Sequence, residues 1–162
     1  MVIGFTSVVG DLFHAGHIRM IEECKEHCDY LIVGVICDPT DRKEKNKPIE
    51  SVYERYYRIS RCKGVDKVIP LENEADLKLF LEMSSNIDIR FVGDDYIGKE
   101  FTGKDVCERK GIRIFYNNRQ HGLSSTSLRE RVKNAKWLYD KMWSNKRIYF
   151  IKIWWIKKHK KK

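Results

Sequence analysis

The sequence has little proline and no long apolar run. Only 3 of its 162 residues are proline, and no apolar segment approaches the ~18 residues that a membrane-spanning helix needs. Hydrophobic residues make up 42% of the chain and charged residues 34%, which excludes a disordered, collagen-like or low-complexity protein. We therefore expect one soluble globular domain with a short stretch of chain to spare.

Cysteine pairs at metal-binding or redox spacing are also missing. The five cysteines are scattered and odd in number, and none belongs to a CxxC motif, which argues against a disulfide framework and against a zinc site. No basic segment precedes the apolar stretch at the start of the chain, so no secretory signal is predicted. Together these absences indicate a cytoplasmic protein with reduced thiols.

Positive charge is present but unevenly placed. The formal net charge is +9, and residues 140–162 contain nine lysines and arginines against Asp140 alone, a net of +8. All four tryptophans also lie beyond residue 136. We therefore predict two parts, a near-neutral domain over residues 1–134 and a basic aromatic tail over residues 135–162.

Short β-branched runs alternate with segments of helical period in the first part of the chain. A continuous apolar run such as Leu31–Ile36 is typical of a parallel strand that is covered on both faces. The pattern predicts an α/β fold, a doubly wound, Rossmann-like parallel sheet of five strands with helices on both faces. Strands are predicted at residues 2–9, 30–37, 65–70, 87–93 and 112–116, and helices at 17–28, 51–62, 73–83 and from about 124.

Two histidines follow the first predicted strand, at the edge of the sheet where ligands bind in such folds. His14 and His17 flank Gly16 at a helix entrance, where free backbone N–H groups and the helix dipole favour an anion. Imidazoles placed there would donate hydrogen bonds to phosphate oxygens and stabilise charge that develops in a transition state. The alternative is that one histidine caps the helix and the other binds a carbonyl group.

A serine-rich segment opens the last predicted helix. It includes Ser124, Ser125 and Thr126, whose hydroxyls and free amides would form a second phosphate-binding helix terminus. Ordinary helix capping would use the same residues. Because this segment and the two histidines both follow strands at the same edge of the sheet, together they predict a cradle for a nucleoside triphosphate.

With these two motifs, residues 2–133 resemble the cytidylyltransferases of the nucleotidyltransferase superfamily, most closely those that act on glycerol 3-phosphate. The HxGH signature of the family is matched by His14 and His17. Its late Arg-x-x-Gly-x-Ser-Ser/Thr-Thr signature is matched by residues 119–126, and its Gly-Asp-Asp by residues 93–95. The resemblance implies transfer of CMP from CTP to a phosphorylated alcohol, with release of pyrophosphate and formation of a CDP-alcohol.

The same resemblance implies roles for individual residues. Lys45-Asn46-Lys47-Pro48 is similar to the lysine loop of the family and Glu54-Arg55 to its Glu-Arg helix, so Lys45 and Arg55 are expected to bind the acceptor phosphate. A Mg²⁺ held mostly by phosphates and water is implied, with Asp11 as its candidate protein ligand. The residues expected to act on the triphosphate are His14, His17, Lys47 and Arg119. Those expected to bind the nucleotide are Val9, Gly10, Gly16, Asp94, Gly122, Ser124, Ser125 and Thr126.

Some positions depart from the family pattern. Val8 stands where the family usually has glycine, and Gly10 where it has an aromatic residue. A lysine near the start of the third helix of the glycerol phosphate enzymes falls on Leu77, with Lys78 beside it. Val8, Gly10 and the basic tail leave open a homologue without catalysis that binds membranes. An adenylyltransferase of the same superfamily that uses ATP also stays open, because the HxGH scaffold serves several nucleotides.

The tail has its own set of alternatives. Residues 148–156 are strongly apolar and aromatic, and five lysines follow within residues 157–162. This composition suits the surface of an anionic membrane, to which the protein would be peripheral. Packing of the tail on the body or on a partner subunit is the alternative, because the family resemblance also implies a homodimer. Nucleic acid is disfavoured as a partner, since the body offers no matching basic groove.

Overall fold

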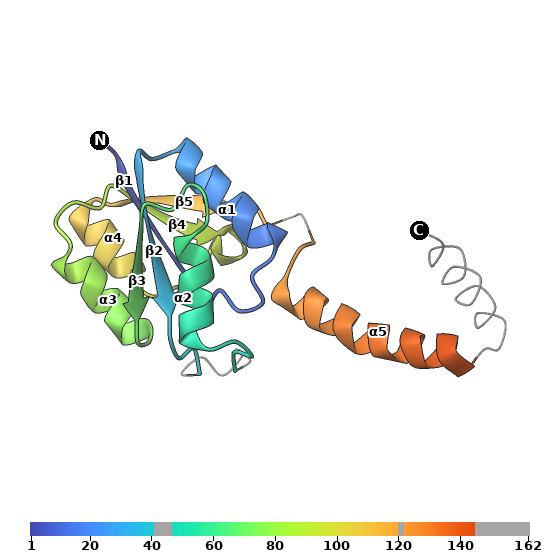
Figure 1. Cartoon of the computed structure of the whole chain (residues 1–162). Helices are drawn as coiled ribbons and strands as arrows, with labels where there is room; N and C mark the ends of the chain where they lie inside the picture. The colour runs from blue at the N-terminus through green and yellow to red at the C-terminus, as the bar shows by residue number, and fades with distance from the viewer. Residues whose placement is uncertain (41–46, 120–121, 145–162) are drawn as a thin grey trace. The chain divides into compact units, whose positions relative to one another are not determined.

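A five-stranded sheet forms the centre of the first part of the chain (Figure 1). The structure, a computed structural model, describes residues 1–40, 47–119 and 122–144. It divides into two units, Met1–Ser125 and Thr126–Lys162. The sheet belongs to the first unit, all four of its strand pairings are parallel, and helices lie on both of its faces, which confirms the predicted α/β class.

The order of the strands indicates where in the sheet a ligand would bind. β1 leads into a loop on one side of the sheet and its neighbour β4 leads into a loop on the other, because the strand order changes direction between them. In parallel sheets ligands bind where such loops part, beyond the carboxyl ends of the strands. In sheet order the strands are β3 (Lys67–Leu71), β2 (Tyr30–Ile36), β1 (Ile3–Val8), β4 (Ile89–Gly93) and β5 (Arg113–Asn117).

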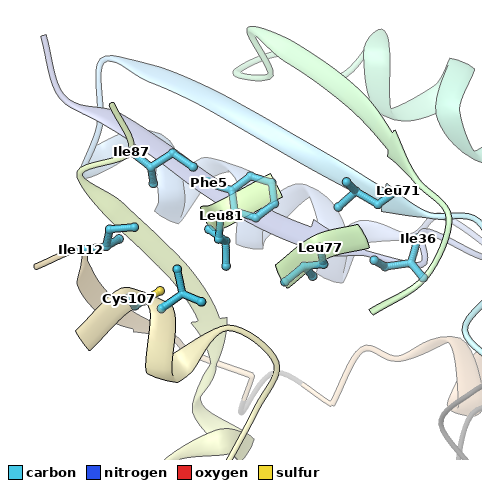
Figure 2. Packing of buried hydrophobic residues seen from close by; sticks show 9 residues of the cluster. Phe5, Ile36, Leu71, Leu77, Leu81, Ile87, Cys107 and Ile112 are labelled. Carbon is cyan, nitrogen blue, oxygen red and sulfur yellow. The ribbon is translucent and has the colours of Figure 1, made fainter. Parts of the chain in front are cut away.

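Two apolar clusters hold helices on the two faces of the sheet. On one face α3 (Glu74–Met83) and α4 (Lys104–Lys110) pack against β1, and Leu77 and Leu81 of α3 are fully buried close to Phe5 (Figure 2). Full burial of each such side chain contributes about 1.5–3 kcal/mol. On the other face the cluster joins α1 (Ala15–Glu26) and α2 (Val52–Ser60) to the sheet; its buried members are Ile21, Cys24, Cys28, Leu31, Val33, Val35, Ile59, Ile89 and Phe91.

Most element bounds lie within two residues of those predicted. The exceptions fall between β4 and β5, where the sequence predicts no element and the structure has a short 3-10 helix, η1 (Asp94–Tyr96), and α4. α4 is only seven residues long, too short for its two buried apolar residues, Val106 and Cys107, to establish a helical period. It is also bounded by Gly103 and Gly111, both with positive φ.

The second unit contains most of the twenty-residue helix α5 (Ser125–Ser144). The compositional boundary predicted at residues 134/135 falls inside α5, and it stays a prediction about composition. The apolar and lysine-rich residues of the predicted tail, 145–162, lie outside the described residues. Among the helices that are described, none is long and apolar enough to cross a membrane.

Candidate functional site

The loop between β1 and α1 turns sharply before it reaches the histidines. Gly10 has φ of +73°, a conformation that side chains with a Cβ rarely adopt. A Cβ at this position would also lie 2.7 Å from Cδ1 of Ile59. The glycine that departs from the family pattern is therefore required by the backbone of this chain and by its packing against α2.

Asp11 ties this loop to the segment that precedes α2. Its side chain is buried, and Oδ1 accepts hydrogen bonds from the backbone N–H groups of Ile49 and Glu50, both at 3.0 Å. Glu50 returns the contact, because its Oε2 accepts from the N–H of Leu12 at 2.8 Å. The sequence did not single out Glu50, since nothing in its neighbourhood marks it as a partner of a residue 38 positions away.

His14 and His17 form a reciprocal cap at the start of α1. Nδ1 of His14 accepts from the N–H of Gly16 at 3.0 Å, and Nδ1 of His17 accepts from the N–H of His14 at 3.3 Å. A neutral imidazole that accepts at Nδ1 carries its proton at Nε2. The two ring centroids are 4.2 Å apart, so the two imidazoles lie next to each other at the start of α1. Capping and anion binding, which the sequence leaves as alternatives, are thus compatible uses of opposite ring nitrogens.

Burial keeps the His17 ring neutral. The pKa of His17 is lowered from 6.5 to about 4, mainly by desolvation and to a smaller extent by the nearby His14 and Arg119, against the opposing effect of Asp11. Phe13 contributes to the burial of His17, because the two rings stack with 5.0 Å between their centroids. At neutral pH His17 is therefore an uncharged hydrogen-bond donor rather than a cation.

This pKa predicts a pH-dependent stability. An unfolded histidine binds a proton below about pH 6.5, whereas folded His17 does so only near pH 4, so its contribution to stability is present above pH 6.5 and is lost as the pH falls. Between pH 7 and pH 5, wild type should lose about 2 kcal/mol more unfolding free energy than His17→Asn. Urea unfolding of both proteins at the two pH values measures this difference, and equal losses would contradict it.

The serine-rich segment lies against the histidine loop. Oγ of Ser125 donates to the backbone carbonyl of Asp11 at 2.8 Å. A Cβ at Gly16 would lie 2.9 Å from the carbonyl oxygen of Leu123, so the chain passes directly over the start of α1. The structure therefore brings the loop at residues 11–16 next to residues 123–125, which are far apart in the sequence, while Ser124 is exposed just before the first residue of α5.

The remaining residues predicted to bind the nucleotide are placed as follows. Val9 is half-buried after β1, Asp94 is half-buried at the start of η1 after β4, and Gly122 is exposed with φ of +66°. Thr126 is the first residue of the second unit, and it is exposed. Val9 and Asp94 thus follow the two central strands, at the edge where the histidines also lie.

Arg119 follows β5 and reaches back toward β4. Its Nη1 donates to both carboxylate oxygens of Asp95, at 3.0 and 3.2 Å. Its charge is one of the causes that lower the pKa of His17, after desolvation and His14. The cation predicted to act on the triphosphate is therefore within electrostatic reach of the histidine pair.

Arg55, which the resemblance assigns to the acceptor phosphate, is buried and hydrogen-bonded to the backbone. Only 1% of its surface is exposed, and its guanidinium donates to four backbone carbonyls, those of Glu50 at 3.2 Å, Val9 and Ile36 at 2.7 Å, and Cys37 at 2.8 Å. These carbonyls belong to the ends of β1 and β2 and to the loop before α2. Arg55 therefore holds the carboxyl edge of the sheet together, and its donors are occupied by the backbone rather than presented to an acceptor phosphate.

The lysine loop is described only in part. Lys45 lies outside the described residues, and Lys47 is exposed. The pKa of Asp38, just after β2, is lowered by hydrogen bonds from Thr40 and, to the smallest extent, by the charge of Lys47. Lys47 thus lies near the carboxyl end of β2, on the same edge of the sheet as the histidines.

The described residues do not form a metal centre by themselves. In residues 1–40, 47–119 and 122–144 no group of three or more His, Cys, Asp and Glu side chains could hold a metal ion. Asp11, the predicted ligand, already uses Oδ1 to anchor two backbone N–H groups. Any Mg²⁺ at this site would depend mainly on phosphate and water oxygens, as magnesium commonly does.

Comparison with known proteins adds the family. Residues 11–131 match the profile of the cytidylyltransferase-like family. Glycerol-3-phosphate cytidylyltransferase of Bacillus subtilis (strain 168) is 34% identical over 122 residues, which cover 75% of this chain and 90% of that protein. Bifunctional protein HldE of Hyphomonas neptunium is 32% identical over 136 residues, and the match spans 83% of this chain but only 28% of that longer protein.

Solved structures agree with these relatives. A lipopolysaccharide core biosynthesis protein of Thermoplasma volcanium superposes with a TM-score of 0.58 at 28% identity, over 73% of this chain and 95% of that one. A putative nicotinate-nucleotide adenylyltransferase of Vibrio parahaemolyticus gives a TM-score of 0.54 at 17% identity, over 83% of this chain and 89% of that one, and shows a shared fold. The profile match and the Bacillus relative go further than the fold. This chain belongs to the cytidylyltransferase-like family of nucleotidyltransferases.

Proposed function

We propose that this protein transfers CMP from CTP to the phosphate of a phosphorylated alcohol such as glycerol 3-phosphate, and releases pyrophosphate. The observation that carries the proposal is the His14–His17 pair at the start of α1, in which His17 is uncharged at neutral pH, with Ser125 hydrogen-bonded to the same loop. The choice of CTP and of glycerol 3-phosphate rests on the Bacillus relative, which this chain matches over nearly its full length.

The reaction needs positioning and charge stabilisation more than a strong base. An oxygen of the acceptor phosphate attacks the α-phosphorus of CTP, and the bond from that phosphorus to the oxygen bridging to the β-phosphate breaks. A phosphate monoester is already anionic at neutral pH, so no serine or cysteine nucleophile is required. The Nε2–H groups of His14 and His17 would donate to the α-phosphate oxygens, whose interaction with donors strengthens in the transition state.

Other residues would neutralise the remaining charge of the nucleotide. Arg119 and Lys47 would bind the triphosphate as cations, and the hydroxyl of Ser124 and the backbone amides of Ser124 and Ser125 would bind the β- and γ-phosphates. Mg²⁺, held by phosphate and water oxygens, would supply further neutralisation of the leaving pyrophosphate. Arg55 has no contact with substrate in this proposal, because it serves the backbone.

Release of pyrophosphate from CTP across a panel of phosphorylated alcohols tests this function. We expect release that depends on the protein, on Mg²⁺ and on one acceptor, with glycerol 3-phosphate first among them. His27→Asn serves as a matched control, because His27 lies at the other end of α1, with its ring 4.1 Å from that of Phe115 between centroids, and the variant should react like wild type. Release with ATP in place of CTP would instead identify an adenylyltransferase, and no release with any pair would overturn the proposal.

The partners expected from the sequence remain proposals. The two edge strands of the sheet are β3 and β5. In a homodimer the partner subunit would cover one of them. Binding to an anionic membrane would use the lysines and aromatic residues within 145–162.

A truncated protein without the tail tests membrane binding independently of nucleotide binding. A protein truncated after Ser144, the last residue of α5, should no longer sediment with anionic vesicles, whereas the full chain should bind them, more weakly at high salt. Neutral vesicles are the control. If both proteins sedimented equally with anionic vesicles, the membrane proposal would be wrong. The tail would then pack on the rest of the chain or on a partner subunit. Truncation should leave CTP affinity unchanged, because all proposed site residues precede Ser127.

A further inference from the structure

Arg119 is directed by a single acidic side chain. Its Nη1 donates to both oxygens of the Asp95 carboxylate, and about half of each side chain is exposed, 55% and 50%. An ion pair with this exposure adds little to stability. What it does fix is the position of Nη1, because both oxygens of the Asp95 carboxylate accept from this one nitrogen.

Gly93 gives Arg119 the room to take this path. A Cβ at position 93 would lie 2.6 Å from Cδ of Arg119 and 3.2 Å from its Nη1, and it would also collide with Oδ1 of Asp95. The backbone at Gly93 has φ of −66° and ψ of 148°, which any residue adopts. The absence of a side chain, rather than backbone freedom, is therefore what this position requires.

The path of Arg119 leads toward the histidine pair. The side chain starts after β5 and crosses the end of β4, and β4 is paired with β1, the strand that leads to His14 and His17. With Nη1 on Asp95, the edge formed by Nε and Nη2 is left as a fork of parallel N–H donors. Such a fork matches two oxygens of one phosphate group.

We propose that Gly93 and Asp95 are positioning residues that hold Arg119 across the end of β4 with its Nε–Nη2 edge presented to the triphosphate. The proposal rests on the proposed function, since it takes the triphosphate as the ligand. It adds two residues that do not touch the substrate and act only through Arg119.

Calorimetry with CTP and with inorganic tripolyphosphate, each with Mg²⁺, tests this assignment without turnover. Removing the guanidinium in Arg119→Ala should weaken both ligands by about 10- to 100-fold, the scale of hydrogen bonds to a charged group. Gly93→Ala should weaken both by about tenfold, and Asp95→Asn by a smaller factor of about three. The double variant Gly93→Ala/Arg119→Ala should bind within about twofold of Arg119→Ala, because both changes act on one side chain.

Two controls separate positioning from damage to the fold. The atoms that a methyl at position 93 displaces belong to exposed, flexible side chains, so Gly93→Ala should melt within about 2 °C of wild type. Glu82→Gln removes a similar exposed ion pair, that of Arg109 with Glu82, and should not change either affinity.

The outcomes distinguish this proposal from the proposed function. Wild-type affinity in Gly93→Ala, or equal weakening by Gly93→Ala in the wild-type and Arg119→Ala backgrounds, would overturn the positioning role alone. Failure of wild type to bind CTP, ATP or tripolyphosphate would overturn both.

Discussion

Replacing His14 or His17 with asparagine should lower turnover by about two to three orders of magnitude while α1 stays capped. Oδ1 of asparagine can take the place of Nδ1, the atom with which each histidine accepts a backbone hydrogen bond. The substitution removes Nε2–H, the donor proposed to bind the α-phosphate. Loss of one such donor to a developing negative charge typically costs 10²- to 10³-fold in turnover.

Steady-state kinetics together with thermal melting check this expectation. The melting temperatures of His14→Asn and His17→Asn at pH 7 should lie close to that of wild type, since the caps are retained. His27→Asn, at the opposite end of the same helix, should retain wild-type turnover. Undiminished turnover in either site variant would show that the pair only caps α1, which is the alternative that the sequence leaves open.

Replacing Arg55 with alanine should lower the unfolding free energy by about 3–5 kcal/mol. The change removes the donors to four backbone carbonyls around an almost fully buried side chain. Buried polar groups that lose their partners cost 1–3 kcal/mol each before relaxation and water entry reduce the sum. Urea unfolding measures the loss.

Arg58→Ala is the matched control for Arg55→Ala. Arg58 lies one turn further along α2, is exposed, and makes one ion pair, with Glu50, so its removal should cost clearly less than the removal of Arg55. An Arg55→Ala protein that melts like wild type and shows a higher KM for the phosphorylated alcohol would contradict the structural role and restore the acceptor-binding one.

The fold was predictable because its signals are local. A continuous apolar strand such as β2 shows burial on both faces directly in the sequence, and the capping residues Ser51 and Asn73 mark the starts of α2 and α3 within one residue. The prediction missed α4, whose seven residues are too few to establish a helical period.

The site was predictable only where a residue type carries the chemistry by itself. The histidines and serines are recognisable because imidazoles and hydroxyls after parallel strands suit phosphate. The roles of Arg55, Glu50 and Gly93 depend on partners distant in the sequence, and an arginine beside a glutamate looks the same whether its guanidinium faces a substrate or backbone carbonyls. In the tertiary structure the guanidinium of Arg55 contacts backbone carbonyls, and the Arg55→Ala variant tests whether that is its role.

A competition between CTP and ATP tests whether this chain makes a CDP-alcohol, as we propose. The protein is incubated with equal concentrations of CTP and ATP, with Mg²⁺ and glycerol 3-phosphate, and the products are identified by mass spectrometry. The account predicts CDP-glycerol with an equal amount of pyrophosphate, and none of either from the His14→Asn/His17→Asn double variant within the same time. ADP-glycerol as the main product, or no nucleotide-alcohol at all, would contradict it.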